Sequence, residues 1–373
     1  MDWSWSEDQQ ALRELSRKIL EELVTHERLK AIETSDDRID REVWKELAKA
    51  NLLGIPFDEA YGGSGMGFLE LIALLEEIGR AVAPVPVYPT LVLAGLPIAR
   101  FGSEAQKQRF LPRIASGDVI LSGALSEPLA ELPEEASTTA KKDGTGFALD
   151  GRKGLVPVAQ LAERVLVSAR AGGGIGLFLL DPRAAGVTLV RQEVTDYEPQ
   201  YVVELSGARV AAEDVLVAPE RGAEAARWLR QHATAALCAM ALGVSERALQ
   251  MTAKYTTERR QFDRPIGSFQ AVHTRAGDAY IDVQAIRLTL LRAVHCLAHG
   301  EDAEEAVAMA KFWASEGGNR ITYAAQHLHG GIGIDLDYPL HRYYLWARQL
   351  SMTLGGATRQ LVRIGEGLAA KAS

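Results

Sequence analysis

Two segments in the last third of the chain carry residue types that bind anions. The first, Tyr255–Gln270 (YTTERRQFDRPIGSFQ), places Arg259 and Arg260 where a helix is expected to end, before a turn that contains Asp, Pro and Gly. A guanidinium group offers paired donors that match the geometry of a phosphate group. Paired arginines at a helix end are also often solvated charge that complements the helix dipole, so this segment alone leaves both interpretations open.

The second segment is rich in glycine. It runs over Gln326–Asp335 (QHLHGGIGID) and is followed by Asp337–Arg342 (DYPLHR). Glycines allow a backbone to approach a ligand closely, and their N–H groups can surround an anion. A helix followed by glycines is also typical of an ordinary C-terminal cap, so this segment too has a purely structural interpretation.

Taken together, the two segments resemble the acyl-CoA dehydrogenase family, which carries R-x-x-F-G-x-P-I-x-x-F-Q and then Q-x-x-G-G-x-G and Y-P. The resemblance covers nearly the whole chain. It implies that both segments bind the adenosine-diphosphate half of FAD on the neighbouring subunit of a dimer. The residues that it assigns to this cofactor-binding role are Arg259, Gln261, Phe262, Gln270, Gln326, His327, Gly330, Gly331 and Gly333. Counting back from Gly330 places the family's glutamine at His327, with Gln326 one position away, and leaves open which of the two faces the cofactor.

The catalytic base of that family has no counterpart in this sequence. The reaction needs a carboxylate to remove the α-proton of the acyl-CoA thioester, held where partial desolvation raises its basicity. The resemblance places this glutamate at Leu354, Gly355 or Gly356, or, as in some members, at Ala233. No Asp or Glu occurs from Tyr338 to Gly365. The acids nearest to Ala233 in sequence, Glu224 and Glu246, lie more than ~13 Å away along a helix. The sequence therefore predicts no catalytic base in this chain.

The part of the family pattern that surrounds the flavin ring is also incomplete. Ser126–Pro128 keeps part of the segment T-E-P-x-A-G-S-D, but Glu131–Pro133 stands in place of its glycine, serine and aspartate. Leu155–Pro157 stands in place of W-I-T. Proline has no N–H to donate, and leucine does not stack as tryptophan does. The ADP half of the pattern is thus nearly whole, whereas the ring half and the base are missing.

This asymmetry predicts a supporting subunit that completes the FAD site of a glutamate-bearing partner. Such an arrangement is similar to the α2β2 heterotetrameric acyl-CoA dehydrogenases of bacterial steroid side-chain breakdown. The resemblance then implies an FAD shared with the partner, an acyl-CoA substrate with a steroid side-chain CoA as one candidate, and electron-transfer flavoprotein as a further partner. Two alternatives stay open: a self-sufficient flavoenzyme of the same fold, such as a flavin monooxygenase, and an assembly protein without flavin.

The elements that must position these segments follow from the periodicity of the apolar residues. Ser6 and Gln9 predict a capping box and an amphipathic helix after it. Further helices are expected at Arg41–Leu53, Phe68–Val82 and from Ser103 to near Gly117, and then at Ala225–Thr256, Val272–His299, Ala303–His327 and from Tyr343 onward. Between them, seven short strands are expected at Val119–Leu125, Gly146–Asp150, Arg164–Arg170, Gly176–Leu180, Val187–Val190, Tyr201–Leu205 and Asp214–Val217.

The order of these elements is the layout of the family that the chain resembles. It predicts an α+β protein with an N-terminal helical domain over residues 1–118, a middle β-barrel or sandwich over 119–222, and a C-terminal four-helix bundle over 223–373. The glycine-rich segment Tyr61–Gly67 lacks the Lys-Ser/Thr pair of a phosphate-binding loop, and no strand precedes it. We interpret it as a connector.

Composition narrows the class of protein further. The chain has 373 residues, 47% of them hydrophobic, and a net charge of −8 from 41 basic and 49 acidic residues, without any basic run. These values argue against nucleic-acid binding. No apolar run approaches the ~20 residues that span a bilayer, and no charged leader opens the sequence, so a cytoplasmic protein without membrane attachment is expected. Cys238 and Cys296, both in apolar helical context, are expected to be reduced core thiols, and no metal site is predicted.

Overall fold

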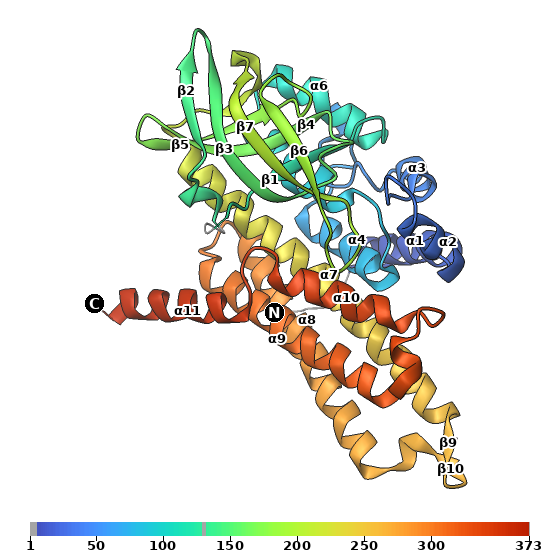
Figure 1. Cartoon of the computed structure of the whole chain (residues 1–373). Coiled ribbons are helices and arrows are strands. Elements are labelled where there is room, and N and C mark those ends of the chain that lie inside the picture. The colour runs from blue at the N-terminus through green and yellow to red at the C-terminus, as the bar shows by residue number, and fades with distance from the viewer. Residues whose placement is uncertain (1–5, 129–131, 373) are drawn as a thin grey trace. The chain divides into compact units, whose positions relative to one another are not determined.

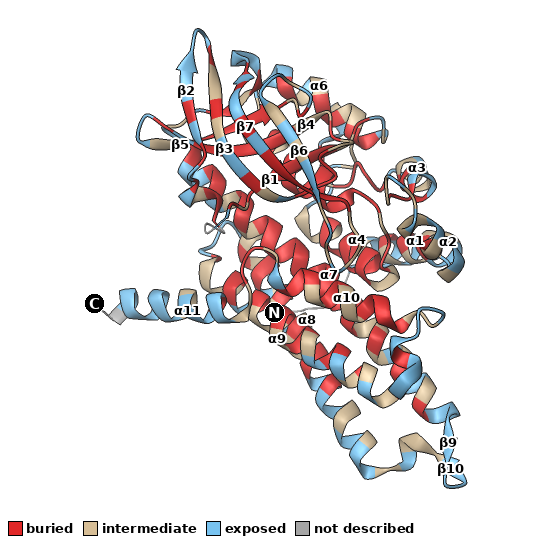
Figure 2. Cartoon of the chain, viewed as in Figure 1, coloured by how far each residue is buried: buried red, intermediate tan, exposed pale blue. Residues whose placement is uncertain are grey.

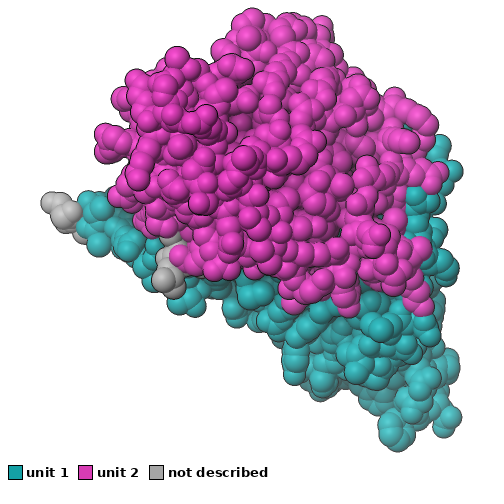
Figure 3. Space-filling model, turned by 45° about the horizontal axis from the view of Figure 1, so that its top comes forward, with its two compact units in different colours: residues 1–29, 72–83, 234–373 teal, residues 30–71, 84–233 magenta. Residues whose placement is uncertain are grey.

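The computed structural model describes residues 6–128 and 132–372 and has two compact units, each built from separate stretches of the chain. Unit 1 comprises residues 1–29, 72–83 and 234–373, and unit 2 comprises residues 30–71 and 84–233 (Figure 3). The domain boundaries after residues 118 and 222 remain predictions. The α+β class itself is confirmed, because helical segments precede and follow a run of strands along the chain (Figure 1).

Unit 2 contains a single eight-stranded sheet of order β6-β7-β3-β2-β4-β5-β8, in which β1 pairs with β4. The strands are β1 (Leu121–Ala124), β2 (Thr139–Asp143), β3 (Gly146–Pro157), β4 (Arg164–Ala171), β5 (Gly174–Leu180), β6 (Val187–Gln192), β7 (Gln200–Val210) and β8 (Val215–Val217). Most neighbours are antiparallel, and β1 and β2 each pair with β4 in parallel. Inward-facing side chains such as Val167, Phe178 and Val203 form an apolar core against the sheet.

Each of the seven expected strands is present, but the sequence analysis missed β2. Only Ala140 of its five residues is buried, so the strand has no apolar alternation that a pattern search detects. Its pairing with β3 is antiparallel and joins Asp143 to Gly146 across a two-residue turn. A strand held by its backbone ladder, with one side chain in the core, cannot be recognised from hydrophobic period alone.

The remaining elements of unit 2 are mostly short helices. They are α3 (Arg41–Lys49), α5 (Leu96–Phe101) and α6 (Glu104–Ala115), the 3-10 turns η1 (Glu59–Tyr61), η3 (Pro133–Glu135) and η4 (Ala212–Asp214), and the π-helix η2 (Tyr88–Gly95). The sequence analysis missed η2 and α5, because it took the prolines after residue 83 as the end of helical structure. Pro89 and Pro97 instead occupy first-turn positions of η2 and α5, where the missing N–H costs no hydrogen bond.

Unit 1 is helical. Its helices are α1 (Glu7–Leu23), α8 (Gln270–His299), α9 (Glu304–His329), α10 (Leu340–Met352) and α11 (Ala357–Ala372), with the 3-10 turns η5 (Ile266–Ser268) and η6 (Gly330–Ile334). Three further helices contribute residues to both units: α2 (His26–Glu33), which the sequence analysis missed, α4 (Phe68–Ala81) and α7 (Gly222–Glu258). The predicted capping box is confirmed, since Ser6 and Gln9 bond reciprocally at the start of α1.

Two glycines allow α4 and α7 to approach each other closely within unit 1. A Cβ at Gly79 would lie 2.1 Å from the carbonyl oxygen of Met240, and a Cβ at Gly243 would lie 1.9 Å from that of Glu76. Any side chain at either position would force the helices apart. This packing fixes α7 against α4. The first candidate segment, Tyr255–Gln270, begins in the last turn of α7, which ends at Glu258.

The last expected helix, from Tyr343 onward, proves to be two helices. The chain leaves α10 after Met352 and enters α11 at Ala357, because Leu354 and Gly355 both have positive φ, +57° and +93°. The side chain of Gln360, fully buried, donates to the carbonyl oxygens of Leu354 and Gly355. This break contains Leu354, Gly355 and Gly356, the residues at which the resemblance places the catalytic glutamate.

Cys238 and Cys296 are free and buried, as expected for core thiols. None of the described helices combines the length and apolar character needed to cross a membrane. Across the part of the chain that the structure describes, no group of three or more His, Cys, Asp or Glu side chains is arranged to hold a metal ion.

A buried histidine in unit 2 makes the stability of the fold depend on pH. His232 stacks on Trp228 with ring centroids 3.9 Å apart, and its Nδ1 lies 2.8 Å from the Trp228 carbonyl oxygen. Burial lowers the pKa of His232 from 6.5 to about 4. The unfolded chain therefore takes up a proton before the folded chain does as the pH falls below 6.5, and stability is lost in that range.

We expect His232 to remove about 2 kcal/mol from the free energy of unfolding between pH 7 and pH 5. Urea denaturation of the parent and of His232→Gln at both pH values measures the contribution as the difference between the two pH dependences. Other titrating groups cancel in that difference. An identical loss of stability in both proteins would contradict the prediction.

Candidate functional site

The segment after α7 forms a small β-hairpin that the sequence analysis described only as a turn. Strand β9 (Arg260–Gln261) pairs antiparallel with β10 (Arg264–Pro265). The two turn residues, Phe262 and Asp263, have φ values of +52° and +63°, which is the backbone of a type I′ turn. Such a turn usually contains Asn or Gly, and neither is present, so the sequence carried no hairpin signal. Residues 260–264 of the hairpin are exposed (Figure 2), and Pro265 is half-buried.

The hairpin separates the roles of the two neighbouring arginines. The Arg260 guanidinium donates to the carbonyl oxygen of Asp263 at 2.9 Å and thereby closes the turn. The Arg259 side chain is exposed and has no hydrogen-bond or ion-pair partner among residues 6–128 and 132–372. Its backbone is fixed, because its N–H donates to Tyr255 and its carbonyl oxygen accepts from Ile266. Arg259 is therefore a positioned cation whose donors are available to a ligand.

The glycine-rich segment continues α9 as the 3-10 turn η6. Gly330, with φ of +67°, caps α9 by donating its N–H to the carbonyl oxygens of Gln326 and His327. The cap interpretation of this segment is thus correct, but it does not account for all of the glycines. A Cβ added at Gly330 or Gly331 would meet nothing within 4 Å, so the surface above them is open to a ligand or a partner.

The structure distinguishes Gln326 from His327. A Cβ at Gly333 would lie 2.8 Å from the Gln326 side-chain oxygen, which shows that this side chain is folded under the η6 turn. That oxygen is buried and has no hydrogen-bond partner within the described ranges 6–128 and 132–372. The His327 side chain is exposed. Of the two, His327 is the residue that points away from the turn.

A cluster of three rings, which the sequence analysis did not single out, joins the two segments. His329 stacks on Tyr255 with ring centroids 4.3 Å apart and an angle of 19° between the rings. Burial lowers the pKa of His329, so the ring is neutral. Its Nδ1 lies 2.8 Å from the Ala325 carbonyl oxygen and therefore carries the proton, which leaves Nε2 to accept from the Tyr338 hydroxyl at 3.2 Å.

The ring cluster brings the predicted residues together. Tyr255 lies one helical turn before Arg259, and His329 directly precedes Gly330, so the stack ties the base of the hairpin to the glycine turn. The Tyr255 hydroxyl is also 3.5 Å from the His329 carbonyl oxygen. The sequence shows aromatic residues and histidines in both segments, namely Tyr255, His327, His329 and Tyr338. Only the packing of the folded chain shows which of these rings contact one another.

The residues on this surface fit the ADP half of a dinucleotide. An exposed arginine with a fixed backbone and open glycines are what a pyrophosphate requires. The exposed members of the predicted set are Arg259, Gln261, Phe262, Gln270, His327, Gly330 and Gly331, whereas Gly333 is buried and Gln326 is half-buried. Phe262 has 87% of its surface exposed, which is unusual for a phenylalanine in a folded chain.

The residues of unit 2 that correspond to the flavin-ring segment do not fit a flavin ring. Leu155 lies in a bulge of β3 with φ of +52°, and its backbone N–H donates to the side chain of Gln192 at 2.9 Å. Pro157 is buried, and its carbonyl oxygen accepts from Ser122. The N–H group of Leu155 is therefore already used within the chain. Glu131 of the replaced segment Glu131–Pro133 lies outside the described residues.

Two charged residues near that segment lie in the core of unit 2. Glu127 and Lys153 form a fully buried ion pair, with Nζ 2.6 Å from Oε1. Glu127 also accepts from Ser137 and from the Thr138 N–H. Burial opposes ionisation of Glu127, but the Lys153 charge and these hydrogen bonds outweigh it and lower the pKa of Glu127. Within the motif remnant at Ser126–Pro128, Glu127 thus has a structural role in the core.

Neither expected position of the catalytic base offers a carboxylate. Leu354 and Gly355 are buried in the break between α10 and α11, and Gly356 is half-buried. Ala233 is fully buried on α7. Glu246, further along the same helix, is held by the guanidinium of Arg287. Glu224, in the first turn of α7, lies nine residues before Ala233, at roughly 1.5 Å of rise per residue.

Comparison with known proteins identifies relatives over nearly the whole chain. The model of the acyl-CoA dehydrogenase N-terminal domain matches residues 6–118, and that of the C-terminal domain matches residues 220–369. The chain is 40% identical to acyl-CoA dehydrogenase FadE27 of Mycobacterium tuberculosis, with 99% of each chain covered. It is 32% identical to FadE28 of the same organism, with 98% of each chain covered.

Solved structures show the same likeness. The chain superposes on one in the ChsE4–ChsE5 complex of Mycobacterium tuberculosis with a TM-score of 0.94, 40% identity and 99% of each chain covered. It superposes on a variant of the Tcur3481–Tcur3483 steroid ACAD with a TM-score of 0.93 and 43% identity, covering 98% of this chain and 99% of that one. Sequence motifs, fold and relatives agree: this chain belongs to the acyl-CoA dehydrogenase family.

Proposed function

We propose that this chain is the supporting subunit of a heteromeric, FAD-dependent acyl-CoA dehydrogenase. It contributes the ADP side of the FAD site to a related partner subunit that carries the catalytic glutamate and the flavin-ring pocket. When bound, the flavin accepts the β-hydrogen of the acyl-CoA as hydride. The chain itself binds and orients one end of the cofactor.

One observation carries this proposal: the two halves of the family's FAD site differ in state within the same chain. Arg259 is exposed, and its side chain has no hydrogen-bond or ion-pair partner among the described residues, while Gly330 and Gly331 leave open space above them. The Leu155 N–H, by contrast, is engaged by Gln192. A chain that had simply lost its activity would be expected to lose both halves of the FAD site, not only the flavin-ring half. A chain that serves a neighbour's cofactor needs only the half that reaches the neighbour.

The roles of the ADP-side residues follow from their geometry. Arg259 pairs with the pyrophosphate, and the open backbone at Gly330 and Gly331 allows the cofactor to approach closely. His327 rather than Gln326 faces the cofactor, because Gln326 is folded under the turn. The stack of Tyr255 on His329 holds the hairpin and the turn at the spacing that one ligand needs.

The relatives support a heteromeric assembly and a bulky acyl-CoA. Two of the solved relatives are two-component assemblies, ChsE4–ChsE5 and Tcur3481–Tcur3483, and the second is described as a steroid ACAD. We infer an α2β2 heterotetramer with a glutamate-bearing paralogue, a steroid side-chain CoA as the substrate class, and electron-transfer flavoprotein as the electron acceptor.

Flavin content tests the proposal. The chain will be purified alone and after co-expression with its glutamate-bearing paralogue, and native mass spectrometry with flavin absorbance will count FAD. We expect little or no FAD in the chain alone, one FAD per heterodimer and two per tetramer. Four FAD per tetramer would mean that the Leu155–Pro157 segment still binds a ring, and the proposal would be wrong.

Turnover by the isolated chain provides a second, independent test. With an acyl-CoA and an artificial electron acceptor we expect none, because neither base position carries a carboxylate. Gly356→Glu should not restore activity, since the ring half is still missing. This position is preferable to Gly355, whose positive φ would strain a glutamate. Clear turnover by the chain alone would favour a self-sufficient flavoenzyme instead.

A further inference from the structure

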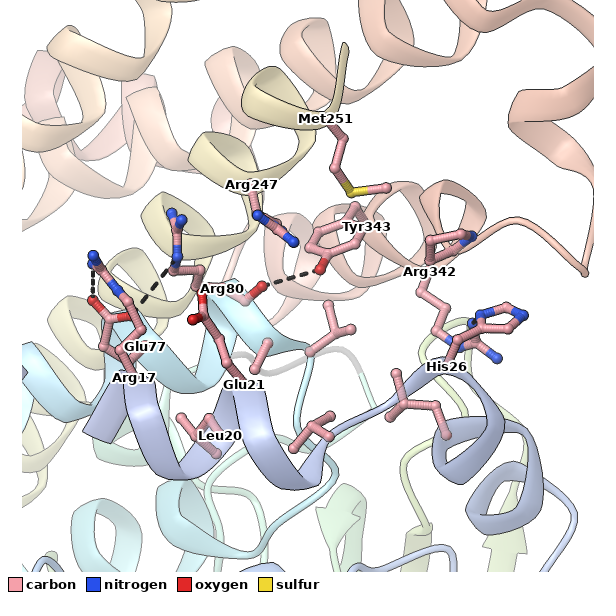
Figure 4. Close-up of a pocket in the computed structure, with 15 residues that line it drawn as sticks. Arg17, Leu20, Glu21, His26, Glu77, Arg80, Arg247, Met251, Arg342 and Tyr343 are labelled. Carbon is pink, nitrogen blue, oxygen red and sulfur yellow. Dashed lines mark hydrogen bonds and ion pairs between the residues drawn. The ribbon is translucent and has the colours of Figure 1, made fainter. Parts of the chain in front are cut away.

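Unit 1 contains a cavity of about 400 Å³ that is separate from the candidate site. Its walls come from α1, the start of α2, the end of α4, the middle of α7 and the start of α10 (Figure 4). Arg247 and Met251 are its residues on α7, roughly 18 and 12 Å along the helix axis before Arg259. Ala233 lies roughly 21 Å from Arg247 in the other direction.

The cavity concentrates positive charge in an acidic protein. Four arginines, Arg17, Arg80, Arg247 and Arg342, line it against two carboxylates among the described lining residues, Glu21 and Glu77. The chain as a whole carries a net charge of −8. Clustered guanidinium groups repel one another, and a packed interior keeps such a cluster only where negative charge offsets it.

Glu77 cannot neutralise the cluster by itself. Its side chain is buried and lies 2.6 Å from Arg17, 3.5 Å from Arg13 and 3.9 Å from Arg80. Arg80 donates to Gln250 at 2.6 Å, but its Nε is buried and has no hydrogen-bond partner among the residues that the structure describes. Burial, and then repulsion by Arg17, lowers the pKa of Arg80. An anion beside Arg80 would relieve both effects.

The other side chains of the cavity suit a ligand with an anionic and an apolar part. Figure 4 shows Arg247 beside Tyr343, whose hydroxyl donates to the Arg80 carbonyl oxygen at 3.1 Å. Arg342, which lies 2.8 Å from His26, forms a second cationic group (Figure 4). Between them the lining is largely apolar, with Leu20, Val24, Leu29, Val82 and Met251.

We propose that this cavity binds a small phosphorylated organic molecule, with its phosphate on Arg80 and Arg247 and its apolar body against Leu20, Val24 and Met251. Two guanidinium groups can bond to all three terminal oxygens of a phosphate group, whereas a carboxylate offers only two oxygens. The volume accommodates more than a free phosphate ion. The site does not use the cofactor surface and does not depend on the function proposed above.

Calorimetric titration at constant ionic strength tests this site, using the full chain in the assembly in which it purifies. The probes are phenyl phosphate, inorganic phosphate and benzoate. We expect saturable binding of phenyl phosphate, with an affinity at least about tenfold higher than the affinities for inorganic phosphate and benzoate. Arg247→Gln should weaken phenyl phosphate binding by roughly ten- to a hundredfold, and Arg247→Lys, which keeps the charge but not the paired donors, should weaken it less.

The matched control is Arg292→Gln. Arg292 is a half-exposed arginine on α8 in the same unit, 3.6 Å from Glu301 and outside the cavity, and its loss should leave binding unchanged. Met251→Trp keeps every charge and fills the cavity, so it should abolish binding without removing an arginine. Thermal melting confirms that each variant is folded.

Four results would overturn the proposal. The first is absence of saturable phenyl phosphate binding by the parent protein. The second is tight binding that persists in folded Met251→Trp or is insensitive to Arg247→Gln. The third is equal affinity for inorganic phosphate and phenyl phosphate, which would assign the cavity to the free ion and reject an organic ligand. The fourth is a benzoate affinity equal to that of phenyl phosphate, which would mean that the cavity does not select a phosphate group.

Discussion

Replacing Lys153 by methionine will lower the free energy of unfolding by about 3–5 kcal/mol. The Lys153 ammonium is fully buried, 2.6 Å from Glu127 and 3.1 Å from the Ser168 hydroxyl. Methionine fills a similar volume but leaves the Glu127 carboxylate buried without its cation. Ser137 and Thr138 still donate to that carboxylate, yet two or three hydrogen bonds do not replace the lost charge.

Chemical denaturation monitored by circular dichroism measures the change. Arg152→Met is the matched control, because Arg152 is the preceding residue, its side chain is 57% exposed, and its ion pair with Glu204 spans 3.7 Å. That substitution should cost less than about 1 kcal/mol. Adding Glu127→Gln to Lys153→Met should recover part of the lost stability. Equal effects of the two single substitutions would mean that the buried pair is not what stabilises this sheet.

Arg259→Ala will weaken FAD binding by about ten- to a hundredfold in the assembled enzyme. A charge-assisted hydrogen bond to a phosphate contributes roughly 1.5–3 kcal/mol. The Arg259 side chain has no hydrogen bond or ion pair among the described residues that its removal would disturb. The chain should therefore remain folded, and excess FAD should restore much of the activity. Flavin fluorescence during titration of the apo-assembly gives the affinity directly.

Arg260→Ala is the internal control for this prediction. Arg260 closes the hairpin through the Asp263 carbonyl oxygen, so its loss should loosen the turn slightly and change FAD affinity much less. Flavin loss in Arg260→Ala but not in Arg259→Ala would exchange the roles of the two residues. If neither substitution affects FAD, the hairpin is only the end of a helix and does not reach a cofactor.

The structure also explains why part of the family pattern persists in a chain that lacks the rest. Glu127 lies in the partly kept segment Ser126–Pro128 and Lys153 lies two residues before Leu155, and the two side chains bond to each other inside the core. Their loss would destabilise the sheet whether or not a flavin binds. Leu155 has no such structural task, since 41% of its surface is exposed. Stability therefore retains the first two residues, and only function would retain the third.

What the sequence determined by itself was mostly local chemistry. The capping pairs Ser6–Gln9 and Ser103–Gln106 were recognisable because a cap involves residues three positions apart. The long helices and seven strands were recognisable from apolar periodicity. The lack of a carboxylate between Tyr338 and Gly365 needed only reading, and so did the arginine and glycine motifs that indicated the family.

The tertiary structure alone decided which of these residues act together. The type I′ turn at Phe262 and Asp263 has no glycine or asparagine, and the helix break at Leu354 places a leucine at positive φ, so neither follows from local preference. The stack of Tyr255 on His329 joins residues 74 positions apart. The arginine cavity gathers side chains from helices at both ends of the chain. Such contacts depend on how helices pack, because packing free energy comes from surfaces that meet only in the folded molecule, whereas sequence periodicity reports only which face of each element is apolar.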